Sequence, residues 1–288
     1  MRHVMAPAYA VERMANNKEL EPIDCPTCER DDSELLFRKD SLSVVACKEC
    51  GLRYVNPRVR RQTLEEGYIE NYYPPEKINR IQTDTMEWLQ MAERLEELEK
   101  HLPTRGRLLD VGCGIGTFLH LAAERGWTPH GIEPSKSGVA VAKENYQLDV
   151  QRGNLFDANF PTAHFDAITA YHVLEHISEL NPFLGELQRI LKPRTGKLVI
   201  EVPNAGSLQS LLQKADWPYV HPRDHLYYFS ARTLPKLLRK HGFGEITLGK
   251  PRRVSPKKGT GFALRGATTA MLVRLHLGTV IRFYASSS

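Results

Sequence analysis

The sequence predicts an α/β protein in which a mostly parallel, seven-stranded sheet carries helices on both faces and a small module precedes it. From Arg107 onward, short apolar runs alternate with amphipathic helical patterns, an order typical of parallel sheets. Before that point, residues 25–50 hold four of the chain's five cysteines in two CxxC pairs. The 288 residues suffice for one domain of about 200 residues and one smaller module.

The composition is that of an ordinary folded protein, with 41% hydrophobic and 25% charged residues and a formal net charge of +5. This mild basic excess neither requires nor excludes an anionic partner. The basic stretch 250–258 is expected to be a solvated loop. The chain has no apolar run of about 18 residues, so no membrane-spanning helix is predicted. Residues 1–20 lack the apolar core of a secretory signal, and the expected location is therefore the cytoplasm.

The cysteine pairs indicate a metal site. Cys25 and Cys28 are followed, after 18 residues, by Cys47 and Cys50. Four thiolates with this spacing can surround Zn²⁺ tetrahedrally, and such a closed site serves folding and not catalysis. Short strands are predicted between the pairs at 33–37 and 42–46. We therefore expect a flexible tail over 1–21 and a structural zinc ribbon over 22–56.

Residues 57–103 are predicted to be a linker followed by an amphipathic helix. The stretch 54–75 is rich in proline and tyrosine, which favours a segment that crosses the surface of the main domain. A helix is then predicted from Asp84, a capping residue, to Leu102, with Pro103 ending it. Its apolar positions, spaced three to four residues apart, predict one buried face.

The main domain, residues 104–250, is predicted to alternate strands and helices. Ser135 is expected to cap the second of these helices, and Asn181 with Pro182 is expected to begin a later one. After residue 250, a helix packed on the sheet and a last antiparallel strand are expected within 251–288. The alternative for residues 262–284 is a helix lying on a membrane surface, because arginines interrupt its apolar residues. The predicted strands are 107–111, 127–133, 149–152, 165–171, 197–202, 243–248 and 280–284, and the predicted helices include 117–125, 135–146, 181–191 and 234–240.

A glycine-rich turn joins the first strand of this domain to its helix. The glycines at 112, 114 and 116 permit positive φ and close approach of a ligand, and the helix beyond offers free N–H groups. A dinucleotide fold favours G-x-G-x-x-G, whereas this chain has G-x-G-x-G followed by Thr117. Asp110 precedes the turn. Glu133 ends the second strand, 17 residues after Gly116, where its carboxylate can accept from two ribose hydroxyls.

Four ordered motifs give residues 105–250 a specific resemblance to the class I S-adenosylmethionine-dependent methyltransferases. Leu109 to Gly116 resembles the first motif of that family, and Gly131 to Pro134 its acidic second motif. Residues 165–176 resemble the fourth motif, and residues 191–198 resemble the turn before the fifth strand. The resemblance implies a Rossmann-like sheet and S-adenosylmethionine as cofactor.

The resemblance also implies roles for individual residues. Asp110 would hold the cationic methionine part of the cofactor, and Glu133 its ribose. Asn154 and Leu155 would border the adenine, although the family more often has Asp at the position of Asn154. The expected cofactor-binding residues are Asp110, Gly112, Cys113, Gly114, Gly116, Glu133, Asn154, Leu155 and His172.

Histidines are the candidates for moving a proton from the acceptor, because imidazole titrates near neutral pH. His172 follows the fourth strand, where functional groups of parallel sheets gather. His225 lies in the aromatic and polar stretch 217–229, and Asp224 beside it is expected to raise its pKa. His176 is expected to be held by local hydrogen bonds. The predicted catalytic residues are therefore His225, His172 and Asp224.

The two-part layout narrows the resemblance further. A four-cysteine ribbon, the passage 50–58 and the tyrosines Tyr68, Tyr72 and Tyr73 are similar to a subgroup that includes sugar C-methyltransferases. That similarity implies O- or C-methylation of a small or glycan-linked acceptor. Ribosomal RNA methyltransferases share the layout, but residues 24–50 carry seven acidic against four basic side chains, so nucleic acid is not the expected partner. A scaffold protein that binds the cofactor without turnover is the remaining alternative.

Overall fold

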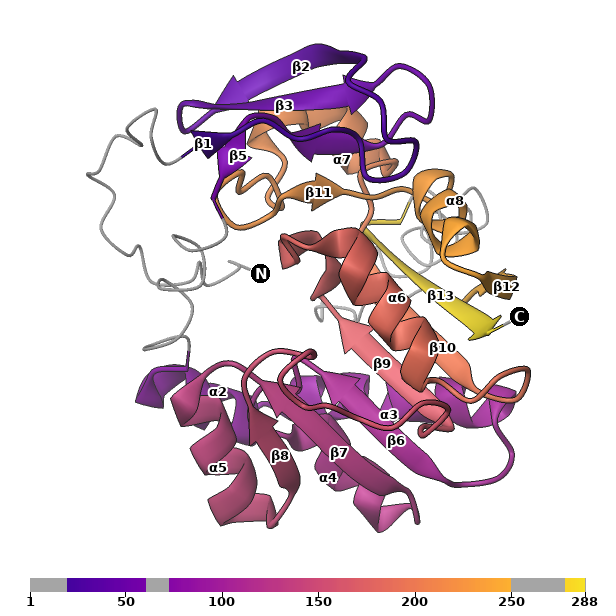
Figure 1. Cartoon of the computed structure of the whole chain (residues 1–288). Helices are drawn as coiled ribbons and strands as arrows, with labels where there is room; N and C mark the ends of the chain where they lie inside the picture. Colours follow the sequence, from indigo (N-terminus) through magenta and orange to yellow (C-terminus); the bar gives the residue numbers. More distant parts are fainter. Residues whose placement is uncertain (1–19, 61–72, 250–277, 288) are drawn as a thin grey trace, which may run out of the picture.

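The structure, a computed structural model, describes residues 20–60, 73–249 and 278–287. Its main sheet has seven strands in the order β12-β13-β10-β9-β6-β7-β8 (Figure 1). β13 runs antiparallel to both of its neighbours, and the pairs from β10 to β8 are parallel. This confirms the predicted mostly parallel sheet. The strands are β6 (Arg107–Val111), β7 (Thr128–Glu133), β8 (Asp149–Arg152), β9 (Ala167–Tyr171), β10 (Lys197–Pro203), β12 (Phe243–Leu248) and β13 (Val280–Ser287).

Helices cover both faces of this sheet, and alternate strand residues face each layer. Leu108 and Val199 pack with α3, α4 and α5, whereas Leu109 and Leu198 pack with α6 and α8. This alternation follows from the two-residue period of a strand. The helices are α2 (Pro75–Thr83), α3 (Thr85–His101), α4 (Thr117–Glu124), α5 (Lys136–Tyr146), α6 (Leu180–Ile190), α7 (Leu208–Gln213) and α8 (Thr233–Lys240), with 3₁₀ turns η2 (Leu174–His176) and η3 (Lys214–Asp216).

Two of the three capping predictions for these helices are confirmed. Asp84 accepts a hydrogen bond from the N–H of Met86, 2.8 Å away, and Ser135 accepts one from Gly138 at 3.3 Å. The prediction that Asn181 caps α6 is wrong, because α6 already begins at Leu180. The amide oxygen of Asn181 instead lies 2.9 Å from Nε2 of His241, so a tertiary contact takes the place of the cap.

The N-terminal module shares a sheet with the main domain. Its strands join in the order β11-β4-β3-β2, and β11 comes from the segment before α8 (Figure 1). Side chains of both parts, among them Val45, Tyr54, Leu226 and Phe229, lie in one apolar core. The sequence did not predict this merger. The strands are β1 (Leu20–Glu21), β2 (Ser33–Lys39), β3 (Leu42–Cys47), β4 (Arg53–Val55), β5 (Arg58–Val59) and β11 (Tyr227–Tyr228).

Both ends of the predicted layout are only partly covered by the described residues. Leu20–Glu21 pairs with Arg58–Val59 and is not part of a tail, while residues 1–19 lie outside the described ranges. β13 confirms the predicted last strand and extends it to Ser287. The predicted loop at 250–258 and the predicted helix before β13 fall outside the described residues. Within the residues that the structure describes, no helix has the length and apolar character needed to cross a membrane.

Gly116 is predicted to be a position where alanine is not tolerated. It has φ +84°, and an added Cβ would lie 2.6 Å from Cδ1 of Leu148 and 3.0 Å from Cβ of Ala142. We expect Gly116→Ala to lower the free energy of unfolding by about 1–3 kcal/mol, through left-handed backbone strain and this crowding. Thermal and urea unfolding measure the effect. The matched control is Gly185→Ala in α6, where nothing lies within 4 Å of the added Cβ and helix propensity favours alanine; equal losses in both variants would contradict the prediction.

Candidate functional site

A cavity of about 940 Å³ opens at the carboxyl ends of β6, β7 and β9. In open α/β sheets this edge is where ligands bind. The glycine turn and Glu133 line one end of the cavity, and His176, Tyr219 and Asp224 line another part of its wall. Asp110, Tyr171 and His172 also line it. The cavity thus joins most of the residues that the sequence singled out.

Backbone N–H groups orient Glu133 at the glycine turn. One carboxylate oxygen accepts from the N–H of Gly114 at 2.9 Å, and the other accepts from the N–H of Ser135 at 2.9 Å. Burial raises the pKa of Glu133, although these two hydrogen bonds oppose the rise. A carboxylate has about four acceptor sites, so each oxygen retains capacity for a ligand hydroxyl.

Asp110 is the second buried acid at this end of the cavity, and it is as little exposed as Glu133. It is 4% exposed, and its Oδ1 accepts from the hydroxyl of Thr169 at 2.6 Å. Burial raises the pKa of Asp110 to about 7, and the hydrogen bond from Thr169 and the charge of Arg94 only partly offset this. A cationic ligand group favours the charged form of a carboxylate, so a carboxylate whose pKa is raised by burial is strongly stabilised when such a group binds.

The glycines of the turn contribute only backbone atoms to the site. Gly112 lines the cavity, and the three glycines at 112, 114 and 116 all have positive φ. Cys113, expected to border the cofactor, turns its thiol into the core: Sγ lies 2.7 Å from the position that a Cβ on Gly131 would take. Its contribution to the turn is therefore its backbone, whose N–H donates to the carbonyl of Ile132.

The loop after β8 lines the cavity through Asn154, Leu155 and Phe156. The amide oxygen of Asn154 accepts from the N–H groups of Phe156 at 2.9 Å and Asp157 at 3.1 Å, so this side chain closes a turn. Phe156 is 38% exposed, which is unusual for such a large apolar side chain. Phe156 was not predicted as a site residue, although an aromatic residue two positions after Asn154 was an available signal.

Tyr73 covers the glycine turn. A Cβ on Gly114 would lie 2.6 Å from the Tyr73 hydroxyl oxygen, and the ammonium of Lys77 lies 4.4 Å from the centre of the Tyr73 ring. Tyr73 lines the cavity, whereas Tyr68 and Tyr72 lie outside the described residues. Helix α2, which carries Lys77, was predicted to be part of the linker. Its proline at the first position and its polar composition masked the amphipathic pattern of this short helix.

His172 ends β9 in an unusual conformation, with φ +58°. Its Nδ1 lies 3.5 Å from Oε1 of Glu175 and its Nε2 lies 3.4 Å from Oε1 of Glu201. Burial opposes the charged imidazole, but the two buried carboxylates outweigh it and raise the pKa of His172 to about 9. Near neutral pH this histidine is therefore protonated, a poor state for a general base.

A buried ion network lies behind His172 and was not anticipated. Glu201 pairs with Arg94 of α3 and, at 2.8 Å, with Nε of Arg282 of β13; Arg282 also pairs with Glu97. The guanidinium of Arg94 lies 4.3 Å from the centre of the Tyr171 ring. These charges hold the pKa of Glu201 well below its ordinary value despite burial. The one indication of this network in the sequence was the acidic residue Glu201 inside the apolar strand 197–203.

Two neutral histidines lie side by side near the cavity, and of these two His176 lines it. Nδ1 of His176 is 2.9 Å from the carbonyl of Asp224, and Nδ1 of His225 is 2.8 Å from the carbonyl of Tyr219. Their ring centroids are 4.6 Å apart. Burial lowers the pKa of His176 to about 4 and that of His225 to about 3. His176 was expected to be held by local hydrogen bonds, but its partner Asp224 is 48 positions away in the chain, and His176 also lines the cavity.

The expected effect of Asp224 on His225 is wrong. Asp224 was predicted to raise the pKa of its neighbour, but it meets His176 through its backbone carbonyl, and the pKa of His225 is lowered. The physical reason is that burial lowers the pKa of His225 and that Asp224 is not among the groups whose charge acts on it. Adjacency in sequence did not bring these two side chains together.

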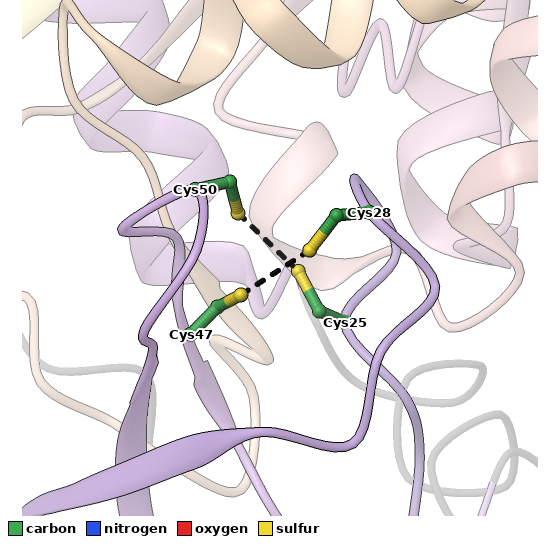
Figure 2. A group of neighbouring side chains, drawn as sticks. All are labelled: Cys25, Cys28, Cys47 and Cys50. Carbon is green, nitrogen blue, oxygen red and sulfur yellow. Dashed lines mark hydrogen bonds between the residues drawn. The ribbon is translucent and has the colours of Figure 1, made fainter.

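The four cysteines of the N-terminal module converge as predicted (Figure 2). The Sγ atoms of Cys25 and Cys50 are 3.4 Å apart, those of Cys28 and Cys47 are 3.2 Å apart, and all four lie within 4.8 Å of one another. Zinc–sulfur bonds of about 2.3 Å in a tetrahedron give sulfur–sulfur distances of about 3.8 Å. The cluster is therefore compatible with a zinc ion.

Helix α8 of the main domain supports both cysteine turns. The ammonium of Lys236 donates to the carbonyl of Cys50 at 3.2 Å, and that of Lys240 donates to the carbonyl of Pro26 at 2.7 Å. Lysines thus bind carbonyls of each turn, close to thiolates whose negative charge they would partly balance.

Comparison with known proteins shows which protein family matches this chain. The family described as "Methyltransferase domain" matches residues 83–247, more than half of the chain. A ubiquinone biosynthesis O-methyltransferase of Rhodopseudomonas palustris (strain BisA53) is 33% identical over 102 residues, which cover 34% of this chain and 40% of that protein. A probable S-adenosylmethionine-dependent methyltransferase of Mycolicibacterium smegmatis is 26% identical over 196 residues, covering 67% of this chain and 69% of that protein.

Solved structures show the same fold. A SAM-dependent methyltransferase from Archaeoglobus fulgidus superposes with a TM-score of 0.55 at 21% identity, over 74% of this chain and 100% of that one. The chain spans about two fifths of the length of the first ubiquinone biosynthesis relatives that it matches. The compounds that those proteins methylate are therefore attributed to those proteins alone.

Proposed function

The chain belongs to the methyltransferase-domain family, and from this premise we propose that it transfers a methyl group from S-adenosylmethionine to a hydroxyl group of a small molecule. The observation that carries the proposal is one cavity with two chemically different parts. Two buried acids and a glycine turn suit a cationic nucleoside. On the acceptor side, neutral His176 lines the cavity, and the ring of neutral His225 lies 4.6 Å from it, centroid to centroid.

The cofactor end would bind S-adenosylmethionine through charge and close backbone approach. Asp110 would pair with the cationic methionine part, and Glu133 would accept from the ribose hydroxyls with the capacity that its two backbone contacts leave. Asn154, Leu155 and Phe156 would border the adenine, with the Phe156 ring available for stacking. Gly112, Gly114 and Gly116 permit the approach, and Cys113 contributes backbone only.

At the acceptor end we assign proton removal to His225, assisted by His176. Both imidazoles are neutral, and their Nδ1 atoms face carbonyl oxygens, so Nε2 carries the basic lone pair. His172 would stay charged and position Glu175 and Glu201. Asp224, exposed at the mouth, would contact the incoming acceptor. The main catalytic contribution would be in-line placement of the two substrates.

A small acceptor with a hydroxyl group fits the surroundings best. The relatives named as ubiquinone biosynthesis O-methyltransferases act, by their name, on oxygen. The acidic surplus of residues 24–50 disfavours a phosphate backbone, so an RNA acceptor is the weaker reading. A glycan-linked acceptor and methylation at carbon remain within the proposal as test cases.

For the four-cysteine module we propose one structural zinc ion. Cys25, Cys28, Cys47 and Cys50 supply four ligands, which leaves no open coordination position for chemistry. Its role would be to hold the two turns that α8 and β11 pack against.

Calorimetry and product analysis test this function. We expect the full chain to bind S-adenosylmethionine and S-adenosylhomocysteine with micromolar dissociation constants and not to bind NAD. Incubation with a panel of phenols, sugar nucleotides and RNA is expected to release S-adenosylhomocysteine only with a small hydroxyl compound. Binding of NAD alone would overturn the proposal, and cofactor binding without turnover on any acceptor class would favour a scaffold protein.

A further inference from the structure

Glu175 is a buried acid without an ordinary partner. It is 1% exposed, and among the described residues neither of its carboxylate oxygens has a hydrogen-bond donor. The nearest charged group is His172, whose Nδ1 lies 3.5 Å away and also faces the charge of Glu201 through Nε2. Charged His172 therefore gives Glu175 an ion pair but no hydrogen bond, and a buried carboxylate without hydrogen-bond donors is costly.

Two histidines bring ligand atoms to the same point. One nitrogen of His176, one of His225 and one carboxylate oxygen of Glu175 all lie within 4.8 Å of one another. Each Nδ1 faces a backbone carbonyl, at 2.9 Å for His176 and 2.8 Å for His225. A carbonyl at Nδ1 fixes the proton there and leaves the lone pair on Nε2, the arrangement found around metal-binding histidines.

The backbone holds this group together. Glu175 and His176 share the turn η2, and the carbonyl of Glu175 accepts from the N–H of Leu226 at 2.7 Å. His225 immediately precedes Leu226, so the loop that carries it is anchored to the turn that carries the other two. The three side chains are therefore positioned by the fold before any ligand arrives.

We propose that Glu175, His176 and His225 bind a divalent transition-metal ion that receives the oxygen of the methyl acceptor. This inference rests on the proposed function and replaces direct proton removal by His225 with a role for His225 as a metal ligand. Two imidazoles and one carboxylate suit Mn²⁺, Fe²⁺, Co²⁺ or Zn²⁺ and leave coordination positions open. His176 lines the cavity, so those positions can face the acceptor.

A metal ion at this position accounts for the loss of the acceptor's hydroxyl proton better than a neutral histidine alone does. Coordination lowers the pKa of a bound hydroxyl group, so the acceptor gives its proton to water. The oxygen's electron pair then forms the bond to the methyl carbon, while the methyl–sulfur bond breaks and leaves its pair on sulfur. The expected acceptors are molecules with two neighbouring oxygens, which chelate such an ion.

Manganese binding to the zinc-loaded full chain tests the site, because four thiolates favour zinc and not Mn²⁺. We expect calorimetry to show one Mn²⁺ per chain, and electron spin echo measurements to show coupling to histidine nitrogen. Glu175→Gln is expected to weaken Mn²⁺ binding at least about tenfold and to leave S-adenosylmethionine affinity unchanged. The matched control is His130→Gln, which removes a histidine that also pairs with a carboxylate, Asp149 at 2.9 Å, at the far edge of the sheet; it should bind Mn²⁺ as the unmodified chain does.

The outcomes separate this inference from the proposed function. If the chain binds S-adenosylmethionine but shows neither Mn²⁺ binding nor nitrogen coupling, the metal site is wrong and the function stands. If Mn²⁺ binds but S-adenosylmethionine does not, the function is wrong and the metal site stands. Equal Mn²⁺ affinity in Glu175→Gln and the unmodified chain also overturns the site. Should Glu175→Gln fail to fold, the nitrogen coupling of the unmodified chain still decides.

Discussion

The Asp110→Asn variant is expected to bind S-adenosylmethionine about 30- to 1,000-fold more weakly and yet to resist unfolding better without it. The loss corresponds to about 2–4 kcal/mol, within the usual effect of removing one partner of a buried charge pair. The gain arises because Asp110 is 4% exposed and burial raises its pKa from 3.8 to about 7. Ionising it in the folded protein therefore costs stability, up to about 4 kcal/mol above pH 7.

The pH dependence of this gain has a definite sign. The folded-state pKa lies above the unfolded one, so the carboxyl group costs nothing well below pH 3.8, and its cost grows as pH rises to about 7. The stability advantage of Asp110→Asn should therefore be larger at pH 8 than at pH 5. Thermal unfolding at both values and calorimetry with the cofactor measure the two effects.

Asp166→Asn is the matched control. Burial opposes the charged form of Asp166, but its pairing with Lys192 at 2.7 Å prevails and lowers its pKa, so removing this charge should lower stability at pH 8. Asp166 lies at the other end of the sheet, and cofactor binding should not change. Unchanged cofactor affinity in Asp110→Asn would show that Asp110 does not meet the cationic group.

Loss of the proposed zinc ion is expected to remove more stability than any single side chain of the main domain. Structural zinc sites contribute roughly 10–16 kcal/mol of apparent binding free energy to folding. In Cys47→Ser we expect zinc to fall below one ion per chain and the melting temperature to drop by more than about 10 °C. Methyl transfer should be lost first, because β4 of this module pairs with β11, two residues after His225.

Metal analysis, thermal unfolding and cofactor calorimetry follow this variant. Cys113→Ala is the control, since Cys113 is the one cysteine outside the cluster and lies in the sheet core. It should retain the zinc content of the unmodified chain. A Cys47→Ser protein with full zinc content and unchanged melting temperature would refute the structural zinc site.

Much of the fold followed from local pattern. The strands from β6 to β10 and the caps Asp84 and Ser135 depend on residues within a few positions of one another, so the sequence shows them directly. The prediction failed where a distant contact decides. Asn181 has the local marks of a cap, but His241 binds its side chain. β11 has two residues, and its strand partner is some 170 positions away in β4.

The candidate site divides in the same way. Asp110, Glu133 and the four cysteines were found because each belongs to a compact motif, and the structure places both acids at the cavity and the cysteines together. The pairing of Asp224 with His225 failed because neighbours in a turn can point apart. Glu175 lies within the stretch 165–176 that resembles the fourth motif, yet its burial without a hydrogen-bond donor depends on packing that no spacing encodes.

The position of β13 bears on how the protein is made. This strand lies between β10 and β12, although both precede it in the chain. Its Arg282 forms ion pairs with both Glu201 and Glu97. Before residues 280–287 leave the ribosome, no strand lies between β10 and β12, and the guanidinium of Arg282 is not yet available to Glu97 and Glu201. The nascent chain therefore holds an open sheet that another polypeptide strand can pair with, and chaperone capture during synthesis would protect it.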